Sequence, residues 1–167
     1  EAAKLYQYFI NQGFNDHRVF SNYGIILKGQ GKLHEAELSQ RKAIELKPDF
    51  LEAHSNLANI LKDLGKLKEA ETFYRKAIEI KPDMAILYSN LGVILKDLGK
   101  SKEAEILQRK AINLNPDLAI AHNNLGNVLR DRGSLKEAEY LQRKAIKLNP
   151  KLYNAYYNLA NILRDIG

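Results

Sequence analysis

The sequence lacks cysteine and tryptophan, and only four of its 167 residues are proline. Without cysteine the chain can form neither a disulfide nor a thiolate metal site. This fits a reducing compartment, and we expect a cytoplasmic protein. No apolar run reaches the 18 residues of a membrane span, and no signal peptide is visible, so we expect no membrane partner.

The net charge of +6 raises the question of a nucleic-acid partner, because Lys and Arg number 26 against 20 Asp and Glu. The charges are interleaved, however, with an acid four residues before a base on each of four helical segments. These pairs are Glu37–Arg41, Glu71–Arg75, Glu105–Arg109 and Glu139–Arg143. Acid-first spacing of this kind stabilises a helix surface. We therefore interpret the basic excess as a solvated face and keep nucleic-acid binding through the basic surface only as a weaker alternative function. Steep loss of binding with salt would indicate that alternative.

The chain repeats with a period of 34 residues. The only prolines are Pro48, Pro82, Pro116 and Pro150, each 34 residues after the last. Asparagine recurs in one column, and small residues recur in three others. Two helical patterns within a fixed period of 34 indicate a helix–turn–helix solenoid, a stacked array without a closed globular core.

We divide residues 1–167 into one array. Residues 1–16 are expected to form the second helix of a partial repeat. Four full repeats follow at 17–50, 51–84, 85–118 and 119–152, and 153–167 form the first helix of a truncated repeat. Because both ends interrupt a repeat, we expect a piece of a longer protein, and we expect its uncapped ends to associate with one another.

Each repeat is predicted to hold two helices, A and B. In the second copy His54, Leu57, Ala58 and Leu61 form the apolar stripe of helix A. Gly65 then ends helix A, since glycine tolerates the left-handed turn after a helix. Helix B is predicted over residues 67–80, and the proline that follows stops it.

The pattern N-L-[GA]-x-x-L-x-x-x-G-x-x-x-E-A, followed by A-I-x-x-x-P, resembles the tetratricopeptide repeat family over the whole chain. The resemblance implies an all-α fold, a right-handed superhelical solenoid of antiparallel helix pairs. The chain departs from the family where Gln40, Gln108 and Gln142 replace a commoner aromatic, as in Tyr74, and we expect looser packing there. The motif N-L-[AG]-N also resembles the repeat arrays of O-GlcNAc transferases and related bacterial multi-repeat proteins.

In this family the A helices line a concave groove, so the side of helix A opposite the apolar stripe is the expected groove wall. That wall carries asparagine at Asn22, Asn56, Asn90, Asn124 and Asn158, with Asn59, Asn127 and Asn161 one turn on. A carboxamide offers a donor and an acceptor, which match the N–H and C=O of one extended peptide residue. The resemblance to the transferase arrays implies this role for the first five. Alternatively, the asparagines bond locally or are simply solvated.

The last turn of the wall adds a row of acidic residues. Its groove residues are Asp63, Asp97, Asp131 and Asp165, flanked by Lys62, Lys96, Arg130 and Arg164. The acidic row favours positively charged ligands, unless the adjacent bases offset it. The family's carboxylate clamp is absent, because its lysine column holds Ser21, Ser55, Ser89, Asn123 and Tyr157. We therefore predict no binding of acidic C-terminal tails in the chaperone manner.

No pattern indicates catalysis or a cofactor. His54 and His122 lie in one column two repeats apart, too distant to share a metal, and we predict packing roles for them. The sequence favours a non-catalytic scaffold that binds a partner protein or an extended peptide in the groove. The alternative is the substrate-recognition arm of a larger transferase whose catalytic domain lies outside this chain.

Overall fold

The computed structural model describes all residues 1–167 and contains ten α-helices and no strand. The chain divides into two compact units, Glu1–Pro82 and Asp83–Gly167. The first unit holds five helices: α1 (Ala2–Asn11), α2 (His17–Gly29), α3 (Leu33–Leu46), α4 (Leu51–Asp63) and α5 (Leu67–Ile80). The second holds α6 (Ala85–Asp97), α7 (Ser101–Leu114), α8 (Ala119–Asp131), α9 (Leu135–Leu148) and α10 (Tyr153–Ile166). The predicted all-α helical repeat solenoid is confirmed.

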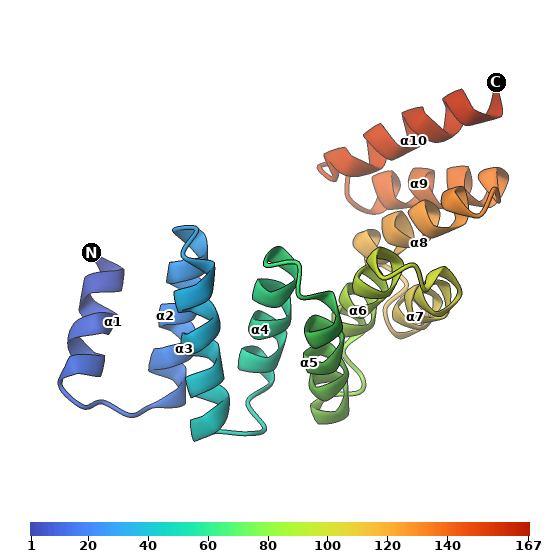
Figure 1. The fold of residues 1–167 in the computed structure, drawn as a ribbon. Coiled ribbons are helices and arrows are strands. Elements are labelled where there is room, and N and C mark those ends of the chain that lie inside the picture. Colours follow the sequence, from blue (N-terminus) through green and yellow to red (C-terminus); the bar gives the residue numbers. More distant parts are fainter. The chain divides into compact units, whose positions relative to one another are not determined.

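Consecutive helices pack as hairpins within each unit. The pairs α2–α3 and α4–α5 lie side by side in the first unit, and α6–α7 and α8–α9 in the second (Figure 1). The alternate helices α2, α4, α6, α8 and α10 are called A helices here, and α3, α5, α7 and α9 are called B helices. Neighbouring A helices within a unit also touch, namely α2 with α4, α6 with α8 and α8 with α10. This contact places the A helices of each unit in one row.

The turn between helices A and B is closed by glycine, as predicted. Gly65 has φ of +74°, and Gly31, Gly99 and Gly133 adopt the same left-handed conformation. The amide of Lys66 donates to the carbonyl of Leu61 at 2.8 Å, which satisfies an end carbonyl of α4. The predicted helix B of the second copy, residues 67–80, is confirmed as α5.

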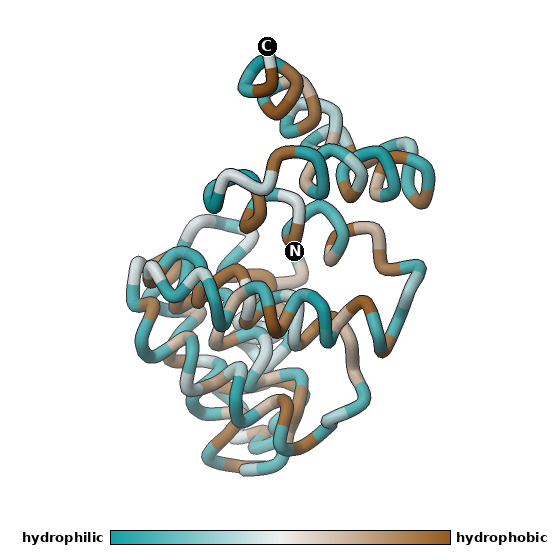
Figure 2. The backbone as a smooth tube through the Cα atoms, turned by 90° about the vertical axis from the view of Figure 1, so that its right-hand side faces the viewer, coloured by the Kyte–Doolittle hydropathy of each residue, from teal (hydrophilic) through white to brown (hydrophobic).

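The core is a series of small apolar clusters between helices, and hydrophobic and hydrophilic residues are interspersed along the chain (Figure 2). In the first unit Leu27, Ala36 and Ile60 pack together from α2, α3 and α4. In the second unit Leu125, Leu129, Ala138, Leu141 and Ile162 join α8, α9 and α10. Each cluster includes residues of two successive repeats, so packing between repeats stabilises the array.

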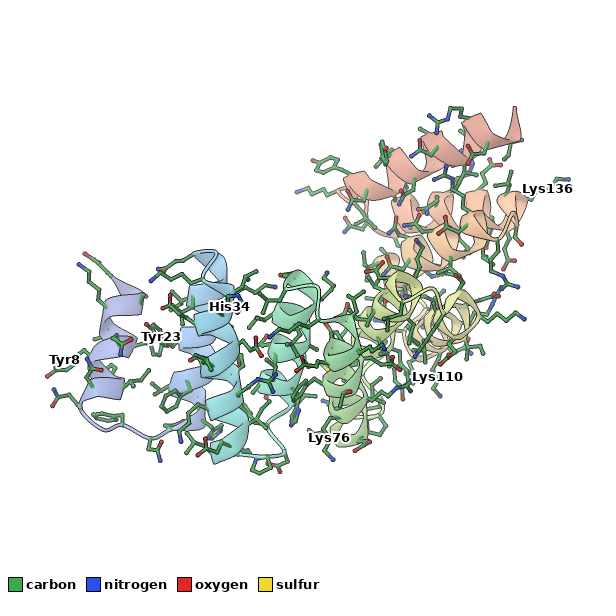
Figure 3. The ribbon with its side chains drawn as sticks, in the orientation of Figure 1. Tyr8, Tyr23, His34, Lys76, Lys110 and Lys136 are labelled. Atoms are coloured by element: carbon green, nitrogen blue, oxygen red, sulfur yellow. The ribbon has the colours of Figure 1, made fainter.

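A polar contact joins helix α1 to the rest of the first unit. The Tyr23 hydroxyl donates a hydrogen bond to Gln7 Oε1 at 2.7 Å, which joins α2 to α1 (Figure 3). None of the ten helices combines the length and apolar content that a membrane crossing requires.

Candidate functional site: the face of the A helices

The A helices divide into a buried and a more open side. In α4 the predicted stripe of His54, Leu57, Ala58 and Leu61 is buried, as expected. Ala53 and Ile60 are buried as well, because the preceding repeat covers a second flank of the helix. Asn56 and Asn59 remain half-buried, and Glu52 and Asp63 are exposed. The open side is the candidate site.

Three asparagines of the candidate site bond to the preceding A helix. Asn56 Nδ2 donates to Ser21 Oγ at 3.5 Å, and Asn124 Nδ2 donates to Ser89 Oγ at 3.2 Å. Asn158 Nδ2 donates to Asn123 Oδ1 at 2.9 Å. Each bond joins residues 35 positions apart, so one amide N–H of each asparagine links two successive repeats.

Sequence reasoning missed these acceptors. The sequence identifies Ser21, Ser89 and Asn123 only as replacements of the clamp lysine, whereas in the structure they accept hydrogen bonds that orient asparagine side chains. The available signal was a serine or asparagine 35 residues before each asparagine of the next copy. Asn22 is exposed, and Asn90 is half-buried on α6.

The second group of asparagines is tied to the B helices. Asn59 Oδ1 accepts a hydrogen bond from the Tyr74 hydroxyl at 2.6 Å, and Asn127 Oδ1 accepts one from Gln142 Nε2 at 2.9 Å. Asn161 is half-buried on α10. These bonds brace helix A against helix B and leave the Nδ2 groups of Asn59 and Asn127 as the remaining donors.

The acidic row is largely paired with bases of the preceding A helix. Three ion pairs follow the 35-residue spacing: Lys28–Asp63 at 3.0 Å, Lys96–Asp131 at 2.8 Å and Arg130–Asp165 at 2.6 Å. The hydrogen bond from Arg130 lowers the pKa of the Asp165 carboxyl below its usual range. Lys62 and Arg164 make longer contacts, at 4.0 Å, with the carboxylates of the adjacent residues Asp63 and Asp165. Asp97 has no ion pair within its own unit. The row therefore presents alternating charge in place of a uniformly acidic strip.

The expectation of loose packing at the three glutamines is wrong. Gln40, Gln108 and Gln142 are fully buried, and Nε2 of each donates to a carbonyl of helix A, at 2.8, 2.8 and 3.0 Å. Each amide occupies the space that a side chain at the facing glycine would need. A Cβ at Gly24, Gly92 or Gly126 would lie 2.6, 2.5 or 2.7 Å from that nitrogen.

The second repeat fills the same contact between helix A and helix B with a different pair of residues. Ala58 replaces the glycine, and Tyr74 replaces the glutamine and is buried. The Tyr74 hydroxyl donates a hydrogen bond to Asn59 Oδ1. Glycine with glutamine, or alanine with tyrosine, are therefore two complete sets of packing partners.

The histidines pack, as predicted. His54 and His122 are buried, and Nε2 of each lies 2.7 and 2.8 Å from the carbonyl of Pro48 and Pro116. A carbonyl can only accept, so these nitrogens carry the proton and donate. No group of three or more His, Cys, Asp or Glu side chains lies close enough to hold a metal ion.

The predicted acid–base pairs of the B helices all form, and Glu37, the acid of the first pair, is buried. These pairs are Glu37–Arg41, Glu71–Arg75, Glu105–Arg109 and Glu139–Arg143, at 2.7–2.9 Å. Arg41 and Arg109 also reach Glu69 and Glu137 of the next repeat, each at 2.8 Å. Lys110 and Lys136 are exposed on B helices (Figure 3). Since acids accompany most of these bases, the B helices carry a mixed-charge surface.

The chain is a series of helix pairs, each closed by a glycine turn, and the pairs stack through contacts between their A helices. These features define a helical-repeat protein with an open polar face. Family profiles described as tetratricopeptide repeat match residues 17–50, 49–117, 119–152 and 141–167. The chain belongs to the tetratricopeptide repeat family. No curated protein matches the sequence.

Solved structures share the fold at low identity. The chain is similar to YrrB, a TPR protein with an unusual peptide-binding site, with a TM-score of 0.74 and 24% identity, covering 96% of this chain and 82% of YrrB. It is similar to TTC0263, a thermophilic TPR protein of Thermus thermophilus, with a TM-score of 0.80 and 19% identity, covering 96% of this chain and 88% of the other. It is also similar to the APC/C hetero-tetramer Cut9–Hcn1, with a TM-score of 0.90 and 19% identity. That match covers 99% of this chain and 33% of the other.

Proposed function

We propose that this protein is an interaction scaffold that binds an extended peptide segment of a partner protein on the open face of its A helices. The observation that carries the proposal is the oriented asparagine row. Asn56, Asn124 and Asn158 are half-buried, and each is held by one Nδ2 hydrogen bond to the preceding A helix. A held carboxamide loses little rotamer freedom when it binds, so its remaining groups are preorganised.

The remaining hydrogen-bonding capacity suits a peptide backbone. Each Nδ2 carries two hydrogens and bonds through only one of them to the neighbouring repeat. Oδ1 of Asn56 and Asn158 is free to accept. Packed helix axes lie roughly 8–10 Å apart, and an extended chain advances about 3.3 Å per residue. Within one unit, successive asparagines would therefore contact about every third peptide residue, largely without regard to its side chain.

Family and fold support the same proposal. The tetratricopeptide repeat YrrB is itself a protein with a peptide-binding site. At 24% identity the likeness establishes the fold, so the site on this chain has to be tested directly. The proposed ladder comprises Asn22, Asn56, Asn90, Asn124 and Asn158.

The test is capture of a displayed library of unstructured peptides by the 167-residue chain. The variant Asn56→Ala/Asn90→Ala/Asn124→Ala removes three carboxamides from the open face. The matched control is Asn113→Ala, because Asn113 is an exposed asparagine on the B helix α7. Circular dichroism must show equal helicity, because the triple variant also loses two hydrogen bonds between repeats.

We expect the wild type and Asn113→Ala to retain the same peptides and the triple variant to lose them. Retention of an unchanged set by the triple variant would place binding away from the ladder. If no form retains peptides, peptide binding by this chain is refuted.

A further inference from the structure

A cavity of about 180 Å³ opens on the A-helix face of the second unit. Its walls include Val93 and Asp97 of α6, Gln108 of α7, and Asn124, Asn127 and Val128 of α8. Sites for drug-sized ligands usually measure about 300–1,000 Å³. This cavity is smaller, and its volume is that of a site for one side chain.

Gln108, which lines this cavity, has a buried acceptor in its side chain. Its side chain is fully buried, and Nε2 donates to the Ser89 carbonyl at 2.8 Å. Oε1, the other end of the carboxamide, is buried without a hydrogen-bond partner. Buried polar atoms are nearly always paired, and an unpaired one is costly. A ligand that brings a donor would satisfy it.

Asp97 gives the cavity its charge preference. It lines the cavity as an exposed carboxylate with no ion pair inside the second unit. Lys96, the only base on the cavity wall, is held by Asp131 at 2.8 Å. The unpaired groups are thus an acceptor and a carboxylate, a combination that attracts a cationic donor.

The other two glutamines lack one part of this arrangement. Gln40 and Gln142 also have an unpartnered Oε1. In the first copy, however, Gly29 stands in the position of Asp97. In the fourth copy that position is Asp131, whose charge Lys96 already offsets. Only around Gln108 do the orphan acceptor and an acid without an ion pair in its own unit occur together.

We propose that this cavity receives a lysine or arginine side chain of the bound peptide. The inference rests on the proposed function, because the extended peptide supplies the side chain. The aliphatic stem would lie against Val93 and Val128, and the cation would face Asp97. A turn of the Gln108 carboxamide toward the cavity would let Oε1 accept one N–H of the cation. The cavity thereby adds side-chain specificity to a ladder that contacts backbone.

The experiment uses peptides captured by the wild-type chain from the same displayed library. Captured sequences are aligned, and the frequency of Lys and Arg is measured at each position. One captured peptide and its Lys→Met or Arg→Met form are then titrated by fluorescence anisotropy. The proteins are wild type, Asp97→Asn, and the control Asp117→Asn, an exposed acid in the turn before α8.

We expect one position enriched in basic residues and binding to Asp97→Asn weakened on the order of fivefold, as for a partly exposed ion pair. The Met peptide should lose that difference, and Asp117→Asn should bind like the wild type. Captured peptides without basic enrichment, or equal affinities for Asp97→Asn and Asp117→Asn, would overturn the inference and leave the ladder intact. Capture of no peptide would overturn both.

Discussion

Replacing Gly126 by alanine is expected to destabilise the second unit by about 3 kcal/mol, although alanine is the better helix former. The new Cβ would lie 2.7 Å from Gln142 Nε2 and 3.3 Å from the Ala138 carbonyl. Gln142 would have to move, and its hydrogen bonds to the Asn123 carbonyl and to Asn127 Oδ1 would be lost. The perturbation therefore tests whether the glycine is required by its packing partner.

The expected loss of stability is the sum of two costs and one gain. Leaving a buried amide donor unpaired costs about 1–3 kcal/mol, and overpacking a full core site costs about 1–3 kcal/mol. Alanine offsets about 1 kcal/mol of these costs, because its helix propensity is higher than that of glycine. The loss exceeds the gain at Gly126. At Gly29, where nothing lies within 4 Å of an added Cβ, only the gain remains, so Gly29→Ala is the matched control.

The assay is urea unfolding followed by far-UV circular dichroism, with the slope compared between variants because repeat arrays need not unfold in one step. The double variant Gly126→Ala/Gln142→Tyr carries the partner set of the second copy, in which Tyr74 bonds to Asn59 beside Ala58. Asn127 already stands in the place of Asn59. We expect the double variant to recover at least about 1 kcal/mol relative to the sum of the two single changes.

A Gly126→Ala variant as stable as the wild type, or more stable, would refute the reasoning. It would mean that helix propensity outweighs the contact with Gln142. Additive single changes would likewise show that the glycine–glutamine and alanine–tyrosine sets are not coupled.

Three further predictions concern charge, histidine and assembly. Burial alone would raise the pKa of the Glu37 carboxyl, but hydrogen bonds from Lys66 and Arg41 outweigh it and lower that pKa. The stabilisation is therefore complete above the unfolded pKa of roughly 4.3 and is lost as pH falls through the folded value. Glu37→Gln should cost about 1–2 kcal/mol in urea at pH 7, and a cost that persisted unchanged at pH 3 would contradict this assignment. His122→Leu removes the bond to the Pro116 carbonyl and should cost about 1 kcal/mol by the same assay, whereas no loss would deny the bond a stabilising role. The large exposed apolar side chains of α1 and α10 should make the light-scattering mass rise with concentration, and a constant monomer mass would exclude end-to-end association.

Local patterns were sufficient for the helices and turns. Apolar spacing located the buried stripe of α4, a glycine column located the turns, and acid–base spacing of four residues located the ion pairs on the B helices. Each of these features depends on residues within one turn or one helix hairpin. The spacing of residue types along the sequence is therefore enough to predict them.

The candidate site was predictable only as a set of positions. The sequence placed asparagines and aspartates on one face of the A helices, and the structure added their partners. Asn124 bonds to Ser89 and Lys96 to Asp131, both across 35 residues. These contacts depend on how one helix is offset along the next, a quantity that a 34-residue period does not contain.

The sequence by itself determined a 34-residue helical repeat, its turns and the polar character of one helix face. The tertiary structure decided which polar groups on that face are already paired and which are free. Gln108 shows the reason: its residue type predicted loose packing, yet Gly92 makes room for a buried carboxamide with one end bonded and the other unpaired. Burial and pairing belong to groups brought together from different helices, and so they appear only once the helices pack.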